Sequence, residues 1–147
     1  MSLKQWADNG WLRPHVSGRQ EIAGLLAIVA RDLNDAAGDI SADWRFGIAY
    51  NAVLKLCTVL MFSSGYRPEK NLAHYRTLAA LPLILPSHGQ MDTAYLDACR
   101  IKRNTVEYDV AGAATHEDAA ELIAFARDLH AEVLSWLKLN HPAFLHG

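Results

Sequence analysis

Residues 42–61 read ADWRFGIAYNAVLKLCTVLM, and this stretch decides the fold class. Apolar side chains recur at helical spacing from Phe46 to Met61, and further apolar residues fill the positions between them. A helix that is apolar nearly all round is usually buried on all sides. We therefore expect a central helix that is capped by Ser41 and broken by the turn-forming residues from Ser63 onward.

Helical periodicity continues on both sides of this stretch. Ser17 is predicted to cap the preceding helix, and Thr115 is predicted to cap the last one. Two more helices are expected in between, over residues 71–82 and from about residue 90 to 109. No segment shows sustained alternation of apolar and polar residues, so we predict no strand. The predicted fold is all-α: an antiparallel bundle of five main helices plus a short N-terminal helix.

The length of 147 residues predicts a single domain, residues 1–147, with a core of about 17–139 and a frayed tail over 140–147. Phe144 and Leu145 are apolar residues by which this tail could dock. The composition is globular, with 51% hydrophobic and 20% charged residues. A formal net charge of −2 argues against a surface that is basic throughout. It leaves room for a local basic patch.

No secretory signal or metal-ligating pattern is visible in the sequence. Cys57 and Cys99 stand far apart in apolar stretches and are expected to be buried free thiols. The central apolar stretch is interrupted by Lys55. We therefore expect a soluble, cytoplasmic protein with no cofactor, no metal and no membrane partner.

The stretch from Arg100 to Asp109 concentrates positive charge, with three cations at Arg100, Lys102 and Arg103. Arg103 lies four residues after Cys99, at the edge of the buried helical face, and a buried guanidinium requires a partner. One interpretation is an ion pair with Glu107 or Asp109. The other is an anion site, in which these cations and His74 bind a phosphate.

The segment Arg103-Asn-Thr-Val-Glu-Tyr-Asp109 resembles the motif region of HEPN domains. The likeness extends to Ala42–Ala52, which is similar to the central helix of that family, and to Gly65–Arg67 followed by His74–Leu78. Together these segments cover roughly residues 20–138. HEPN domains are small helical bundles of prokaryotic toxin–antitoxin and defence systems, often encoded beside a nucleotidyltransferase.

The resemblance implies a homodimer in which two motifs share one cleft, and a metal-independent ribonuclease chemistry that uses an Arg and a His. Arg103 and Asn104 match this motif, but Tyr108 stands where the His is expected. A phenol with an ordinary pKa of about 10 is a poor general base at neutral pH. His74 is a second candidate source of an imidazole.

Two functions follow as hypotheses. The first is a dimeric HEPN-like module that binds a protein partner, such as a nucleotidyltransferase, or a nucleotide or RNA ligand, with degenerate or no catalysis. The alternative is a metal-independent endoribonuclease toxin that acts through Arg103, Asn104 and Tyr108.

Overall fold

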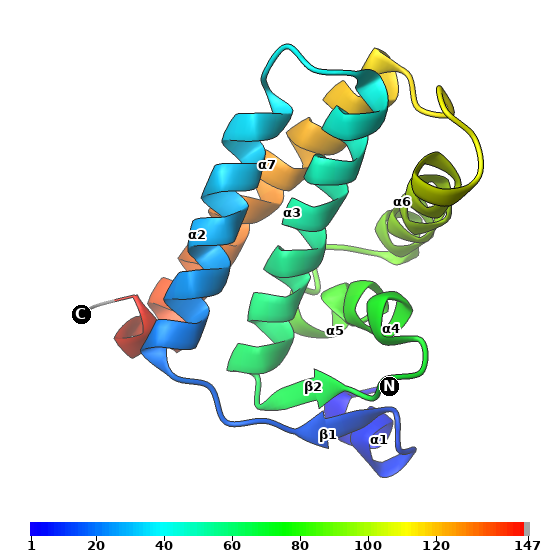
Figure 1. Cartoon of the computed structure of the whole chain (residues 1–147). Helices are drawn as coiled ribbons and strands as arrows, with labels where there is room; N and C mark the ends of the chain where they lie inside the picture. Colours follow the sequence, from blue (N-terminus) through cyan, green and yellow to red (C-terminus); the bar gives the residue numbers. More distant parts are fainter. Residues whose placement is uncertain (146–147) are drawn as a thin grey trace.

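The computed structural model describes residues 1–145, and this part of the chain is mostly helical. Three long helices, α2 (Arg19–Ala36), α3 (Ala42–Ser63) and α7 (His116–Asn140), pack against one another along their lengths. Figure 1 shows α2 and α3 running antiparallel, with α7 behind them. The predicted all-α helical bundle is confirmed.

The α3 helix forms the centre of the core, as its sequence predicts. Buried side chains cover more than half of its circumference, among them Phe46, Leu56 and Leu60. The remaining face, which includes Trp44 and Asn51, is exposed or partly buried. By length and composition α3 could also span a membrane, but 67% of its most apolar window is buried inside the bundle. The same apolar character is therefore explained by its place at the centre of the fold.

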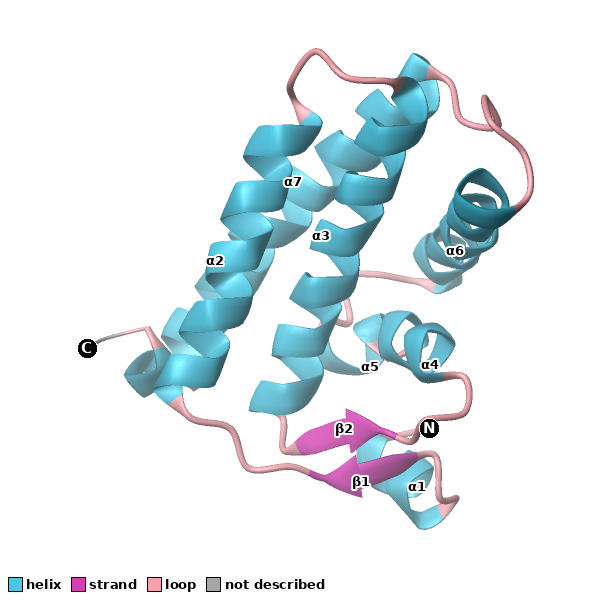
Figure 2. Ribbon diagram, in the orientation of Figure 1, coloured by secondary structure: helices cyan, strands magenta, loops and turns pink. Residues whose placement is uncertain are grey.

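A second group of helices covers one side of α3: α4 (Ala73–Ala79), α5 (Leu81–Ile84) and α6 (Gln90–Tyr108). Figure 2 shows α6 beside α3, apart from the α2 and α7 pair. One helix is predicted over residues 71–82, but the structure has two short ones. Pro82 lies in the first turn of α5, where its missing N–H is not needed, whereas inside a continuing helix it would interrupt the hydrogen bonds.

The N-terminal segment contains the short helix α1 (Leu3–Asp8) and the strand β1 (Leu12–Pro14), which pairs antiparallel with β2 (Tyr66–Pro68). The prediction of no strand is therefore wrong. Each strand is only three residues long, too short for an alternating pattern to be detectable. The sheet and α1 cover one end of the bundle around the buried side chain of Trp6.

Two boundary predictions also differ from the structure. Gly18, and not Ser17, is the N-cap of α2, because the Ser17 hydroxyl instead donates to the Phe62 carbonyl oxygen at 2.9 Å. The sequence predicts a frayed tail in which Phe144 and Leu145 could dock, and Pro142–Phe144 form a 3-10 turn after α7 with both of these side chains against the core. The Phe144 ring stacks on His141 and packs against the core. The last two tail positions, 146 and 147, lie outside the described residues.

Candidate ligand-binding site

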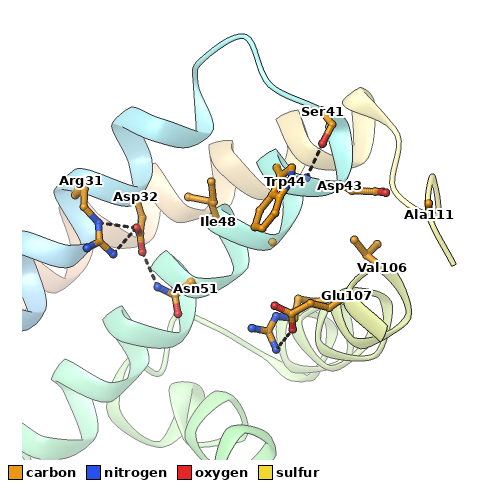
Figure 3. A pocket seen from close by; sticks show the side chains of 12 residues that line it. Arg31, Asp32, Ser41, Asp43, Trp44, Ile48, Asn51, Val106, Glu107 and Ala111 are labelled. Carbon is orange, nitrogen blue, oxygen red and sulfur yellow. Dashed lines mark hydrogen bonds and ion pairs between the residues drawn. The ribbon is translucent and has the colours of Figure 1, made fainter. Parts of the chain in front are cut away.

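A pocket of about 490 Å³ opens between α2, α3 and α6. Figure 3 shows its lining: Arg31 and Asp32 come from α2, Trp44 and Asn51 from α3, and Glu107 from α6. The remaining lining residues are Ser41, Asp43, Gly47, Ile48, Arg103, Val106 and Ala111. Polar groups thus converge on an apolar wall, which is the usual make-up of a small-molecule site.

A buried carboxylate joins the two helices on one side of the pocket. Asp32 is only 4% exposed, and its Oδ2 accepts a hydrogen bond from Nδ2 of Asn51 at 2.6 Å. Its Oδ1 accepts from Nε and Nη2 of Arg31 at 3.2 and 3.0 Å. The sequence analysis missed this network. The sequence does carry a signal for it: Asp32 follows Val29 by three residues, so a charged residue stands on the apolar face of α2 and requires a buried partner.

Arg103 enters the pocket from α6 and is paired within the chain. Its Nη1 lies 2.9 Å from Oε2 of Glu107, one helical turn later, and its side chain is 25% exposed. The intramolecular ion pair that the sequence offers as one interpretation is therefore present. The guanidinium carbon also lies 5.7 Å from the ring centroid of Tyr50. Burial raises the pKa of that phenol to about 12, although Arg103 itself acts to lower it.

Further cations lie near α4: the guanidinium carbon of Arg100 is 5.8 Å from the ring centroid of Tyr75. Partial burial holds the pKa of His74 below its ordinary value, and Arg103, Lys55 and Arg100 lower it further. Arg100 is also bound by Oδ1 of Asp97 at 2.9 Å. We call Lys55, His74, Arg100 and Arg103 the basic cluster. Three of the four residues predicted to bind an anion belong to it.

The fourth predicted anion ligand, Lys102, is not brought to this cluster. Its Nζ donates to Oδ2 of Asp118 at 3.0 Å and so faces α7. Two residues of the expected catalytic motif also lie outside the pocket lining. Asn104 is exposed, and Tyr108 is 75% exposed at the end of α6. The structure thus brings Arg103 to the pocket and leaves Asn104 and Tyr108 on the outer surface.

The charges of the pocket do not favour a phosphate inside it. Three carboxylates and two guanidiniums line it, and each carboxylate already accepts hydrogen bonds or an ion pair from this chain. Asp43, for example, accepts from the backbone N–H groups of Gly112 and Ala114 at 2.6 and 3.1 Å. The indole of Trp44, in contrast, is 67% exposed. The pocket therefore suits a neutral planar group, and the basic cluster beside it suits an anion.

Comparisons with known proteins identify no relative: no family model, no curated protein and no solved structure matches the chain. Among the residues that the structure describes, no group of His, Cys, Asp and Glu is arranged to hold a metal ion.

Proposed function

We propose that this chain is a HEPN-like module that binds RNA or a nucleotide without cleaving it. One observation carries the proposal: Arg103 lies both in the wall of the pocket and in the basic cluster. A base in the pocket and its phosphate on the cluster would therefore be contacted by the same guanidinium.

The pocket supplies what a base requires. An exposed aromatic ring such as Trp44 can stack on a base, and this contact is worth roughly 1–3 kcal/mol per base. The Asn51 amide keeps its Oδ1 as an acceptor while Nδ2 donates to Asp32. An amide of this kind is suited to the hydrogen-bonding edge of a base.

The basic cluster supplies what a phosphate requires. Guanidinium groups bind phosphate oxygens through planar pairs of N–H donors, and Lys55 adds a point charge. The ion pair between Arg103 and Glu107 competes with this contact but is partly exposed, so it is worth little and is easily exchanged. A phosphate can therefore replace the carboxylate without a large loss of free energy.

The proposal is tested by fluorescence anisotropy with a labelled single-stranded oligoribonucleotide in EDTA, at two or more salt concentrations. Trp44→Ala should weaken binding by about 5- to 150-fold, the loss of one stacked base. Arg103→Ala should weaken binding and reduce the salt dependence by about one phosphate contact. Arg127→Ala, at an exposed position on α7, is the matched control. Unchanged binding by Trp44→Ala would reject the proposed base site.

A ribonuclease remains the second candidate because His74 shares the basic cluster with Arg103. The lowered pKa favours the neutral imidazole, which is the form that accepts a proton from a 2′-hydroxyl. On this alternative, RNA is cut in EDTA, and both His74→Ala and Arg103→Ala abolish cutting while Tyr108→Phe does not. Intact RNA recovered after incubation favours the binding module.

A further inference from the structure

A second pocket, of about 710 Å³, lies among β1, the segment that follows β2, and α4. We call it the N-terminal pocket and define it by six of its lining residues: Trp11, Arg13, Glu69, Lys70, Leu72 and Arg76. Figure 2 shows β1 and α4 at the opposite end of α3 from the loop that joins α2 to α3. The two pockets share no lining residue, so the N-terminal pocket is separate from the site proposed above.

Arg76 on α4 is held against an aromatic platform in this pocket. Its guanidinium carbon lies 3.9 Å from the ring centroid of Trp11, which is close enough for a cation–π contact. Trp11 in turn meets the ring of Trp6 edge-on, with 5.8 Å between the ring centroids. Trp6 is itself buried. The platform therefore fixes the guanidinium of Arg76 in one place.

Stacking uses the face of this guanidinium and leaves its N–H donors free, because the donors point outward in the plane of the group. One of its nitrogens, Nη1, is buried and has no hydrogen-bond acceptor among the described residues. A buried donor without an acceptor is costly, and nearly all such groups in proteins are satisfied. Arg76 therefore has unused capacity to bind an acceptor from outside the chain.

Positive charge surrounds Arg76 and is only partly compensated. Arg13 forms an ion pair with Glu69, but neither Lys70 nor Arg76 has a carboxylate partner in the described part of the chain. The lining of three cations and one carboxylate has a net charge of +2. Arg67 stands opposite Arg13 in the pairing of β2 with β1 and adds a further cation. Like charges in opposite positions repel each other, and a bound anion would relieve this repulsion.

We propose that the N-terminal pocket binds a phosphomonoester through Arg76, Lys70 and Arg13. A phosphomonoester carries about −1.5 to −2 charges at pH 7 and has terminal oxygens that accept hydrogen bonds, which matches the net charge of the lining. A carboxylate or a phosphodiester carries only one negative charge. The guanidinium of Arg76 supplies a planar set of donors for the phosphate oxygens, and Lys70 supplies a point charge.

The pocket also has room for the group that carries the phosphate. Its volume of about 710 Å³ falls in the range of pockets that hold small molecules. Trp11 and Leu72, which is 59% exposed, give it an apolar wall beside the cations. A small phosphorylated molecule and the terminal phosphate of an RNA strand present the same doubly charged group. The inference goes beyond the proposed function and does not depend on it, because Trp44 and Arg103 take no part.

NMR titration of the ¹⁵N-labelled chain with inorganic phosphate, at pH 7.5 and constant ionic strength, tests the site. We expect saturable shifts of the Trp11 indole N–H and of the backbone amides of residues 10–13 and 69–72. Lys70→Gln should raise the dissociation constant by about 2- to 5-fold, the loss of one exposed charge contact. Lys138→Gln, at an exposed position on α7, removes the same charge elsewhere and should leave the dissociation constant unchanged. Shifts that do not saturate, or equal dissociation constants for the native chain and Lys70→Gln, overturn the proposal.

Arg76→Gln should have the larger effect and raise the dissociation constant by about 10-fold or more, because it removes charge-assisted hydrogen bonds. Arg76 also packs on Trp11, so the same spectra must show that this variant is folded. If it is not, the exposed Lys70 carries the test. A folded Arg76→Gln variant that binds phosphate as tightly as the native chain overturns the proposal. Trp44→Ala should leave the phosphate titration unchanged, so the two proposed sites fail separately.

Acetate and a pair of oligoribonucleotides identify the anion and its source. Acetate, with a single charge, should bind at least about 5-fold more weakly than phosphate, and equal affinities would overturn the choice of a phosphomonoester. If the source is RNA, a 5′-phosphorylated strand should bind more tightly than its 5′-hydroxyl counterpart, and Lys70→Gln should reduce the difference. Equal binding of the two strands, with saturable binding of inorganic phosphate, would assign the pocket to a small phosphorylated molecule.

Discussion

Asn51 on α3 donates a 2.6 Å hydrogen bond to Asp32 on α2, and this contact joins two core helices beside the pocket. Asp32 is the only charged side chain among the buried residues that the structure describes. An ionised carboxylate in such a place depends on its donors. The bond therefore supports both the bundle and the shape of the pocket.

We predict that Asn51→Ala lowers the free energy of unfolding by about 1–3 kcal/mol, because it removes one of the donors to a buried carboxylate. Urea denaturation at pH 7 measures the change. Asn34→Ala, at an exposed position on α2, is the matched control and should alter stability by less than about 0.5 kcal/mol. Equal losses in the two variants would mean that the Asn51 bond contributes nothing specific.

The N-terminus of α7 is closed by a capping box. The Thr115 hydroxyl accepts from the Asp118 N–H, and the Asp118 carboxylate accepts from the Thr115 N–H, both at 3.0 Å. Thr115→Ala should therefore cost about 1 kcal/mol of stability in thermal or urea unfolding. Ser135→Ala, exposed in the interior of the same helix and far from its N-terminus, should be neutral or slightly stabilising. A neutral Thr115→Ala would show that the cap is dispensable.

Two histidines should make stability depend on pH. Burial lowers the pKa of His130, and burial together with the neighbouring cations lowers that of His74, relative to the ordinary value of 6.5. The unfolded chain then binds more protons, so these groups make stability rise as pH increases from the folded-state pKa values to about 6.5. Comparing urea curves at pH 5.5 and 7.5 checks this. The variants His74→Gln and His130→Gln should each show a smaller difference between the two curves, and an unchanged difference in both would contradict the prediction.

Glu107 should compete with the ligand for Arg103, since their side chains form an ion pair at 2.9 Å. Glu107→Gln removes the competing charge, and we expect it to tighten oligoribonucleotide binding by about 2- to 5-fold at low salt. The advantage should shrink as salt is added. Glu117→Gln, exposed at the start of α7, controls for the change in net charge. Equal gains in both variants would indicate a general charge effect.

The fold class could be predicted because it depends on the spacing of apolar residues and on capping residues, and these patterns recur in each long helix. Burial of α3 follows from a long apolar sequence, and the cap of α7 follows from Thr115 and Asp118. The two-stranded sheet could not be predicted in this way. Its pairing of Arg13 with Arg67 joins segments that are far apart in the sequence, and three-residue strands carry no periodicity.

The candidate site was predictable only in part, for a related reason. Helical spacing places Arg103 on the inner side of α6 and offers Glu107 as its partner, and both are found. It cannot show which residues of other helices meet them. Trp44 and Asn51 therefore emerge only from the packing of α3 beside α6, and Lys102 turns away because Asp118 lies within reach on α7.

The two-stranded sheet has a further consequence for how this protein behaves at high concentration. Both strands are edges, and an exposed edge normally offers N–H and C=O groups to a strand from another molecule. Here β1 ends at Pro14 and β2 ends at Pro68, so neither terminal position has an amide proton to donate. A two-stranded sheet with such short strands and so few free donors is a poor template for a growing sheet. Pairing of this sheet edge with a strand from another molecule is thereby disfavoured.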